Sequence, residues 1–250
     1  MIGGIFYEHG HRMIASFVGL LTIVLACWLA SVEHRKWVKK LGWLALAMVV
    51  LQGVLGGITV LFLLPTVVSV GHACLAQLFF CIVCILALVT SPGWQNRNKD
   101  KSYTLSSERV SSLRRLTIAT NSAIFLQLIL GATLRHKAFG VVPHLLGAVI
   151  VTLLVVWVVI QVASQHSDER EILNWTLMLN GLLAAQLLLG AATYWIRHVT
   201  EFSPQPLPSM VALTVTHLVV GALVLASSVV LTFQVGRAVD IRTRKLPQVS

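Results

Sequence analysis

Seven long apolar runs restrict what this chain can fold into. They cover approximately residues 9–31, 41–63, 67–91, 113–134, 143–164, 173–196 and 208–235. A helix needs about 20 apolar residues to cross the hydrocarbon core of a bilayer, and each run meets that length. Hydrophobic residues make up 56% of the chain and charged residues only 11%. Strands of membrane barrels are shorter and alternate in polarity. The sequence therefore predicts an all-α integral membrane protein with seven transmembrane helices.

Basic residues are distributed unevenly over the connections between these runs. Fifteen of the 19 Lys and Arg residues follow the first, third or fifth run or lie in the C-terminal tail: Arg35, Lys36, Lys39, Lys40, Arg97, Lys99, Lys101, Arg109, Arg114, Arg115, Arg170, Arg237, Arg242, Arg244 and Lys245. Because positive loops stay in the cytoplasm, we expect the N-terminus outside the plasma membrane and the C-terminus inside. Topology accounts for the net charge of +10, so no nucleic-acid partner is expected.

Four histidines lie near the outer ends of four different predicted helices: His11, His72, His144 and His217. Ionisable side chains inside a membrane are costly and usually functional. Helical bundles hold haem iron between paired axial imidazoles, so four histidines on one side predict two haem sites. A small residue follows each histidine four positions later, which would let a flat macrocycle lie on that face or let helices pack closely: Ala15, Ala76, Ala148 and Gly221.

The chain also contains an internal repeat. A Q-x-x-L-G-small-x-T block occurs at 52–59 and again at 186–193, and a similar block occurs at 127–133. His11 precedes Gln52 by 41 residues, and His144 precedes Gln186 by 42. The first three predicted helices therefore match the last three. This pattern predicts two pseudo-symmetric halves, a 4+4 arrangement lacking the first helix, with residues 1–92 and 113–250 joined by a cytoplasmic linker at 93–112.

Charged side chains at the outer boundary form a second group of candidates. Glu8 lies three residues before His11 and therefore on nearly the same helix face. It is either a helix N-terminal carboxylate, which the helix dipole favours, or a proton-handling group beside a haem edge. Arg12, Arg135 and Arg197 are either interfacial anchors or partners for anionic haem propionates.

These motifs, taken in order, resemble the haem A synthase family. The resemblance rests on the E-x-x-H-R motif at residues 8–12, the three glutamine blocks, and the three later histidines, and it covers nearly the whole chain. It implies two four-helix halves and an enzyme that oxidises the C8 methyl of haem O to the formyl of haem A through two hydroxylations and loss of water. It also implies that His11 and His72 flank the substrate haem, that His144 and His217 ligate a haem b cofactor, and that Glu8 is the acid at the substrate site.

The chain departs from this family pattern in two ways. The family's first helix has no counterpart before residue 9, which leaves open a misplaced start, a natural seven-helix form, or a helix supplied by a partner. Many members carry cysteine pairs in outer loops, and the four cysteines here all lie within apolar runs. The electron donor therefore stays open, as do the oxygen source and the oligomeric state, and haem O synthase is a candidate partner.

Two other functions compete with this interpretation. A di-haem b cytochrome that only carries electrons would use the same paired imidazoles. A transporter with histidines as proton relays would need acidic or polar partners in the middle of its helices, where this chain has almost none. Glu8 beside His11 favours oxidative chemistry over electron transfer alone.

Overall fold

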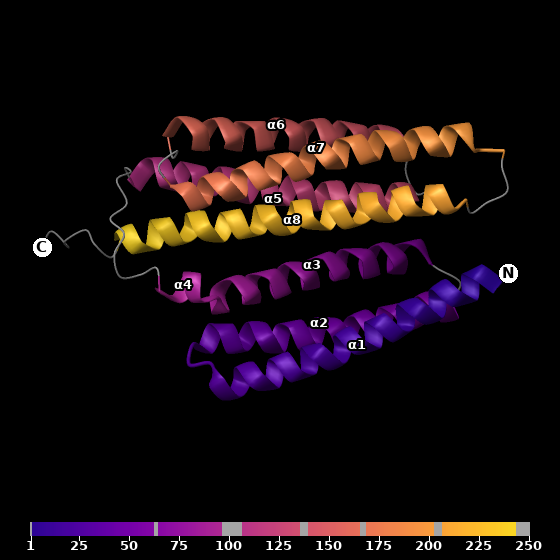
Figure 1. Cartoon of the computed structure of the whole chain (residues 1–250), viewed down its shortest axis with the longest axis horizontal. Helices are drawn as coiled ribbons and strands as arrows, with labels where there is room; N and C mark the ends of the chain where they lie inside the picture. Colours follow the sequence, from indigo (N-terminus) through magenta and orange to yellow (C-terminus); the bar gives the residue numbers. More distant parts are fainter. Residues whose placement is uncertain are drawn as a thin grey trace, which may run out of the picture. The chain divides into compact units, whose positions relative to one another are not determined.

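The structure is a computed structural model that describes residues 2–62, 65–96, 107–135, 140–165, 169–202 and 207–243. At 2–8, 96, 107–109 and 239–243 only the backbone is described. Every regular element in these ranges is a helix (Figure 1). In chain order they are α1 (Ile2–Val32), α2 (Lys36–Leu61), α3 (Thr66–Thr90), α4 (Pro92–Asn96), α5 (Ser107–Arg135), α6 (Val141–Gln165), α7 (Arg170–Val199) and α8 (Pro208–Thr243). All except the short α4 are long and apolar enough to cross a membrane, which confirms the seven predicted spans.

The helices extend beyond the apolar runs that predict them. The second begins at Lys36 rather than at 41, and the sixth spanning helix covers Arg170–Val199 rather than 173–196. Hydropathy marks only the part of a helix that meets hydrocarbon, whereas the backbone stays helical until it reaches a cap. At the start of α2, the Lys39 ammonium donates to the carbonyl of Ala30 near the end of α1, over 2.7 Å. Such contacts satisfy terminal carbonyls that have no partner within the helix.

The chain divides into two compact units, Met1–Gln95 (unit 1) and Asn96–Ser250 (unit 2). In unit 1, α2 packs against both α1 and α3, while α1 and α3 do not contact each other in their described parts. The predicted linker at 93–112 includes α4 and the start of α5, and its residues 97–106 lie outside the described ranges.

Unit 2 forms a closed ring of four helices. Each of α5, α6, α7 and α8 packs against two neighbours, and α5 closes the ring by contacting both α6 and α8. A hydrogen-bonded chain joins α5 to α8: the Ser228 hydroxyl donates to Asn121 Oδ1 over 2.5 Å, and Asn121 Nδ2 donates to Thr232 Oγ1 over 2.8 Å. Polar bridges of this kind help to hold helices together in lipid, where no water competes.

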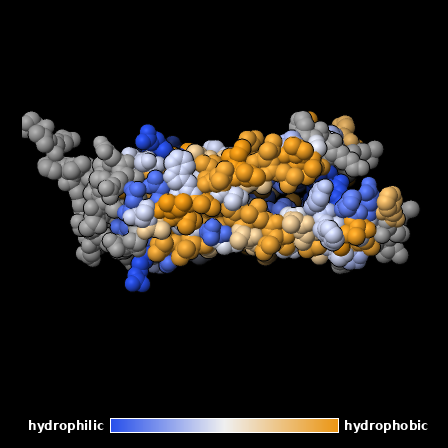
Figure 2. Space-filling view, turned by 90° about the horizontal axis from the view of Figure 1, so that it is seen from above, coloured by the Kyte–Doolittle hydropathy of each residue, from blue (hydrophilic) through white to orange (hydrophobic). Residues whose placement is uncertain are grey.

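The surface of the helices is that of a multi-pass membrane protein. On the face shown in Figure 2, hydrophobic residues cover the middle of the visible helices, and hydrophilic residues gather toward their ends. Large apolar side chains are exposed throughout, for example Phe17 at 61%, Leu146 at 61% and Leu188 at 73%. A soluble protein rarely exposes contiguous apolar surface on this scale, whereas a bilayer solvates it.

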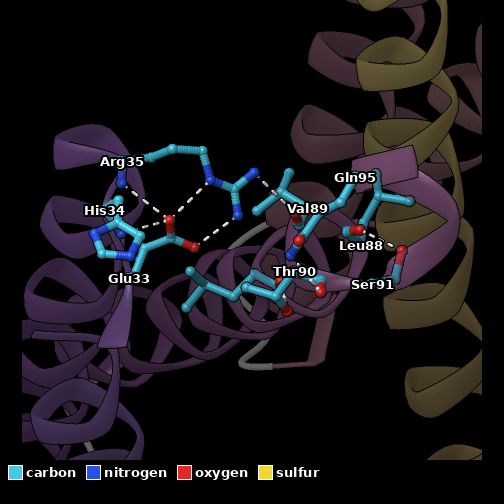
Figure 3. Close-up of polar contacts among 9 residues, drawn as sticks. Glu33, His34, Arg35, Leu88, Val89, Thr90, Ser91 and Gln95 are labelled. Atoms are coloured by element: carbon cyan, nitrogen blue, oxygen red, sulfur yellow. Dashed lines mark hydrogen bonds and ion pairs between the residues drawn. The ribbon is translucent and has the colours of Figure 1, made fainter. Parts of the chain in front are cut away.

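A polar clip fastens one end of unit 1 (Figure 3). The Arg35 guanidinium donates to both oxygens of the Glu33 carboxylate, over 3.0 and 2.6 Å, and also to the carbonyl of Val89 at the end of α3, over 3.0 Å. The backbone N–H groups of His34 and Arg35 donate to the same carboxylate. These hydrogen bonds, chiefly the guanidinium's, lower the pKa of Glu33 from 4.5 to about 2. The clip therefore ties the α1–α2 connection to the end of α3.

Candidate functional site: two histidine pairs and their glutamine partners

Each unit brings together one of the predicted histidine pairs. His11 on α1 and His72 on α3 belong to unit 1, and His144 on α6 and His217 on α8 belong to unit 2. His11 is exposed, whereas the other three side chains are half-buried. The described residues contain no group of three or more His, Cys, Asp or Glu side chains arranged to hold a metal. Each unit thus contains two of the four histidines, the number that axial ligation of one haem would require.

In unit 1, a glutamine from the neighbouring helix contacts the second histidine. The side-chain amide of Gln52 on α2 donates to the backbone carbonyl of His72 over 3.0 Å, and its nitrogen lies 3.4 Å from His72 Nε2. Gln52 is the first residue of the repeated block, so the block places its amide against the histidine of the next helix.

In unit 2, the matching residues make the same contact. The side-chain nitrogen of Gln186 on α7 lies 3.4 Å from His217 Nε2 on α8, the same pair of atoms at the same distance as in unit 1. The helices α1, α2 and α3 thus correspond to α6, α7 and α8 in their histidine and glutamine positions. This agreement is what the repeat predicted from spacing requires.

The glutamine on α5 makes the shortest of these contacts. Gln127 Nε2 donates to the carbonyl of His144 over 2.8 Å and lies 3.1 Å from His144 Nδ1. At 3.4 Å an amide–imidazole contact is long for a hydrogen bond, whereas 3.1 Å is within the usual range. Among the described residues, three of the four histidines therefore have a glutamine partner, and His11 has none.

A glycine one turn after each glutamine makes room for the imidazole. A Cβ atom added at Gly56 would lie 3.4 Å from His72 Cε1, and one added at Gly131 or Gly190 would lie 3.1 Å from Cε1 of His144 or His217 respectively. The Q-x-x-x-G spacing thus combines a polar contact with a close approach of the imidazole, which is tighter than an ordinary side-chain contact at Gly131 and Gly190 and ordinary at Gly56. Each of these three imidazoles thus rests on one glycine and contacts one glutamine, and we call this glycine–glutamine pair the seat of the ring.

The accommodation is reciprocal in unit 2. A Cβ atom at Gly147, three residues after His144, would overlap Oε1 of Gln127. One at Gly221, four residues after His217, would lie 3.0 Å from Nε2 of Gln186. Gly221 was among the small residues expected to leave a face for a macrocycle. In the structure this position also serves to admit the glutamine of the neighbouring helix.

Several polar atoms of these seats lack a protein partner. They are Oε1 of Gln52, Gln127 and Gln186, together with Nδ1 of His72 and His217, all buried and without a hydrogen bond among the described residues. An unsatisfied buried polar group costs about 1–3 kcal/mol, so such groups rarely collect without a function. Uncommitted imidazole nitrogens beside glycine seats fit the donor set that a haem iron needs.

The predicted charged residues lie at the same ends of these helices. Arg135 is the last residue of α5, Arg197 lies in the last turn of α7, and Arg12 follows His11 on α1; all three side chains are exposed. At the C-terminal ends of α5 and α7, the cations of Arg135 and Arg197 complement the helix dipole. Glu8 lies on α1 one turn before His11, but its side chain is outside the described part of the chain.

Sequence reasoning identified the glutamine blocks as markers of the repeat but missed their contacts. The available signal was the recurrence of Q-x-x-x-G one helix before three of the four histidines. Hydropathy could not reveal it, because the rotation of each helix about its axis decides which side chains meet. The Glu33–Arg35 clip was also missed, although a Glu-x-Arg motif directly after an apolar run indicates a helix-end ion pair.

Comparisons with known proteins identify the family of this chain. A heme A synthase from Symbiobacterium thermophilum is 27% identical over 211 residues, which cover 74% of this chain and 67% of that protein. No solved structure matches the chain. The family model described as cytochrome oxidase assembly protein (COX15-CtaA) matches residues 4–143, more than half of the length. The chain therefore belongs to this cytochrome oxidase assembly protein family.

Proposed function

We propose that this protein is a haem A synthase-like oxidoreductase that converts the C8 methyl of haem O into the formyl group of haem A for a terminal oxidase. The observation that carries the proposal is the pair of histidines in each unit, three of the four rings being seated on a glutamine and a glycine. Family membership and the similarity to a heme A synthase support the pathway.

Unit 2 is the proposed cofactor site. His144 and His217 would ligate a haem b, which when bound supplies one-electron redox chemistry. The two rings approach from α6 and α8, and Gln127 and Gln186 fix them from α5 and α7. Arg135 and Arg197, exposed at the ends of α5 and α7, would pair with the anionic propionates.

Unit 1 is the proposed substrate site. His11 and His72 would flank haem O, and Arg12 would pair with a propionate of the substrate. Glu8, one turn before His11, would accept a proton or stabilise positive charge as the methyl group is oxidised. The exposed His11 ring suits a ligand that must arrive as haem O and leave as haem A.

The membrane context follows from the loop charges. We infer a plasma-membrane location with the N-terminus outside and the C-terminus in the cytoplasm, so that both histidine pairs lie toward the outer side. Haem O synthase and an electron donor are the proposed partners. A reporter fused after residue 100 should then be cytoplasmic and one fused at 200–205 external, and the reverse result would contradict this orientation.

The haem content of the purified protein tests the proposal directly. Pyridine haemochrome analysis with chromatography of the extracted haems should find haem b together with haem O, an alcohol intermediate or haem A. Haem b alone would identify a di-haem electron carrier instead. A protein without any haem would contradict both functions.

Two sets of substitutions assign the sites. His144→Ala and His217→Ala should each abolish the low-spin haem b spectrum, because loss of one axial imidazole leaves a high-spin or empty site. Glu8→Gln should retain haem b but stop or stall haem A formation. An unchanged low-spin band in either histidine variant would refute the ligand pair, and wild-type haem A formation in Glu8→Gln would reduce Glu8 to a helix-end carboxylate.

A further inference from the structure

We propose that Gln127 is a positioning residue for His144 whose amide reverses its hydrogen-bonding role when the haem site of unit 2 is filled. The inference rests on the proposed function, in which His144 is an axial ligand. In the structure, Gln127 Nε2 contacts His144 Nδ1 and donates to its carbonyl, while Gln127 Oε1 is buried without a partner. The glutamine thus has one satisfied end and one unsatisfied end.

The proton on the imidazole determines which end is needed. Because Gln127 contacts Nδ1, the nitrogen left for a metal is Nε2. A neutral imidazole that binds a metal through Nε2 carries its proton on Nδ1. An amide N–H cannot hydrogen-bond to that Nδ1–H, but the amide oxygen can accept from it. A half-turn of the amide therefore brings the unpartnered Oε1 to Nδ1, and it gives up the 2.8 Å hydrogen bond from Nε2 to the carbonyl of His144. The ring stays neutral because only its tautomer changes.

The packing around Gln127 leaves room for a half-turn of the amide and for little more. Gly147 leaves only enough space for the amide, since a Cβ atom there would overlap Oε1, and Leu130 Cδ1 lies 3.2 Å from the same point. Gly131 on the other side holds the imidazole against α5. The two ends of an amide have nearly the same size, so a half-turn keeps the packing while it replaces a donor by an acceptor.

This exchange has an electronic consequence for the proposed ligand. An acceptor on Nδ1–H increases the basicity of the imidazole and favours the ferric over the ferrous state. Gln127 should therefore lower the reduction potential of the unit 2 haem. If Gln127 only filled space, replacing its acceptor oxygen by a group of similar size would leave the reduction potential unchanged.

Potentiometric titration and electron paramagnetic resonance of the haem-loaded full-length protein test the inference. Gln127→Met keeps the length of the side chain but accepts no strong hydrogen bond, so the potential should rise. Gln127→Glu has an acceptor oxygen in either protonation state, so the potential should stay at or below that of the wild type. Gln161→Met on the same helix as His144 is the control and should leave the potential and the low-spin g values unchanged.

Gly147→Ala supplies an independent variant that leaves Gln127 in the sequence. The new methyl group should displace the amide from Nδ1 and raise the potential as Gln127→Met does. Gly181→Ala on α7, where a Cβ atom meets nothing within 4 Å, is the matched control. If Gln127→Met loses its haem, Gly147→Ala still decides the question.

The outcomes separate this inference from the proposed function. The amide exchange is supported if the reduction potential rises in Gln127→Met and stays at or below the wild-type value in Gln127→Glu. Potentials and g values equal to wild type in Gln127→Met and Gly147→Ala, or equal rises in Met and Glu, overturn it. If the wild-type protein has no low-spin haem, or keeps it in His144→Ala, the proposed function fails instead.

Discussion

Unit 2 closes into a ring of four helices, whereas unit 1 is an open series of three in which α1 and α3 do not meet within their described parts. Both units place a histidine pair on corresponding helices, but only unit 2 seats both rings against a glutamine and a glycine. In unit 1 His72 is seated and His11 is exposed without such a partner among the described residues. The proposed roles fit this difference, since a resident cofactor needs a preorganised site such as unit 2 and an exchanging substrate needs an accessible one such as unit 1.

The largest expected effect of this difference is on haem exchange. Transfer of haem from the purified protein to apomyoglobin should be biphasic, with the unit 1 haem leaving at least about tenfold faster, which corresponds to ~1.4 kcal/mol. His11→Ala should remove the fast phase and leave the slow one. A single slow phase, or a fast phase that His144→Ala removes, would show that the exposed His11 does not weaken its site.

Alanine at the glycines that contact the imidazoles should destabilise unit 2 more than unit 1. In Gly131→Ala and Gly190→Ala, the Cβ lies 3.1 Å from an imidazole carbon, so the ring must shift and the thermal stability of the haem-loaded protein should fall. A loss of 1 kcal/mol corresponds to about 2–4 °C in a chain of this size. In Gly56→Ala the distance is 3.4 Å, an ordinary contact, so little change is expected.

Gly181→Ala is the control for that series, because its added methyl meets no neighbour within 4 Å. Alanine favours a helix over glycine by up to about 1 kcal/mol, so this variant should be as stable as the wild type or more so. Equal losses in Gly56→Ala and Gly131→Ala would mean that the seats of the two units are equally tight.

The stability of unit 2 should depend modestly on the hydrogen bonds that join α5 to α8 through Asn121. Asn121→Ala removes the acceptor of Ser228 and the donor to Thr232, so the link between α5 and α8 is lost. Hydrogen bonds between membrane helices contribute about 0.6 kcal/mol on average, so a decrease of roughly 1 kcal/mol is expected in reversible unfolding from mixed micelles. Ser122→Ala, at an exposed position on α5, should be neutral.

The smallest effect concerns the clip of unit 1 and depends on pH. The pKa of Glu33 is lowered from 4.5 to about 2, so its contribution to stability is complete above pH 4.5 and is lost as the pH falls toward 2. Above pH 5, Glu33→Gln should be less stable than wild type by about 1 kcal/mol, because an ion pair near the protein surface contributes little to stability. The difference should shrink on acidification, and a constant difference from pH 6 to pH 2.5 would contradict a role for the charge.

The sequence predicted the parts of the fold that lipid dictates. Backbone groups in hydrocarbon must be satisfied within a helix, so each apolar run had one structural solution. The histidines on matched helices also indicated the two pairs. Which side chains meet across helices depends on rotation and approach, so the contact between Gln127 and His144 could not be derived from spacing alone. The reach of Arg35 to Val89 likewise required a tertiary arrangement that joins residues 54 positions apart.

The mutual fit of Gln127 and Gly147 also constrains how this protein can change through evolution. The amide of one residue occupies the space that any side chain at the other would need. A larger residue at 147 becomes acceptable only after 127 has shortened, and a shortened 127 leaves a void until 147 has grown. Residues in direct contact generally show non-additive effects of this kind. The two positions should therefore behave as one epistatic unit, in which the double replacement harms the protein less than the sum of the single replacements.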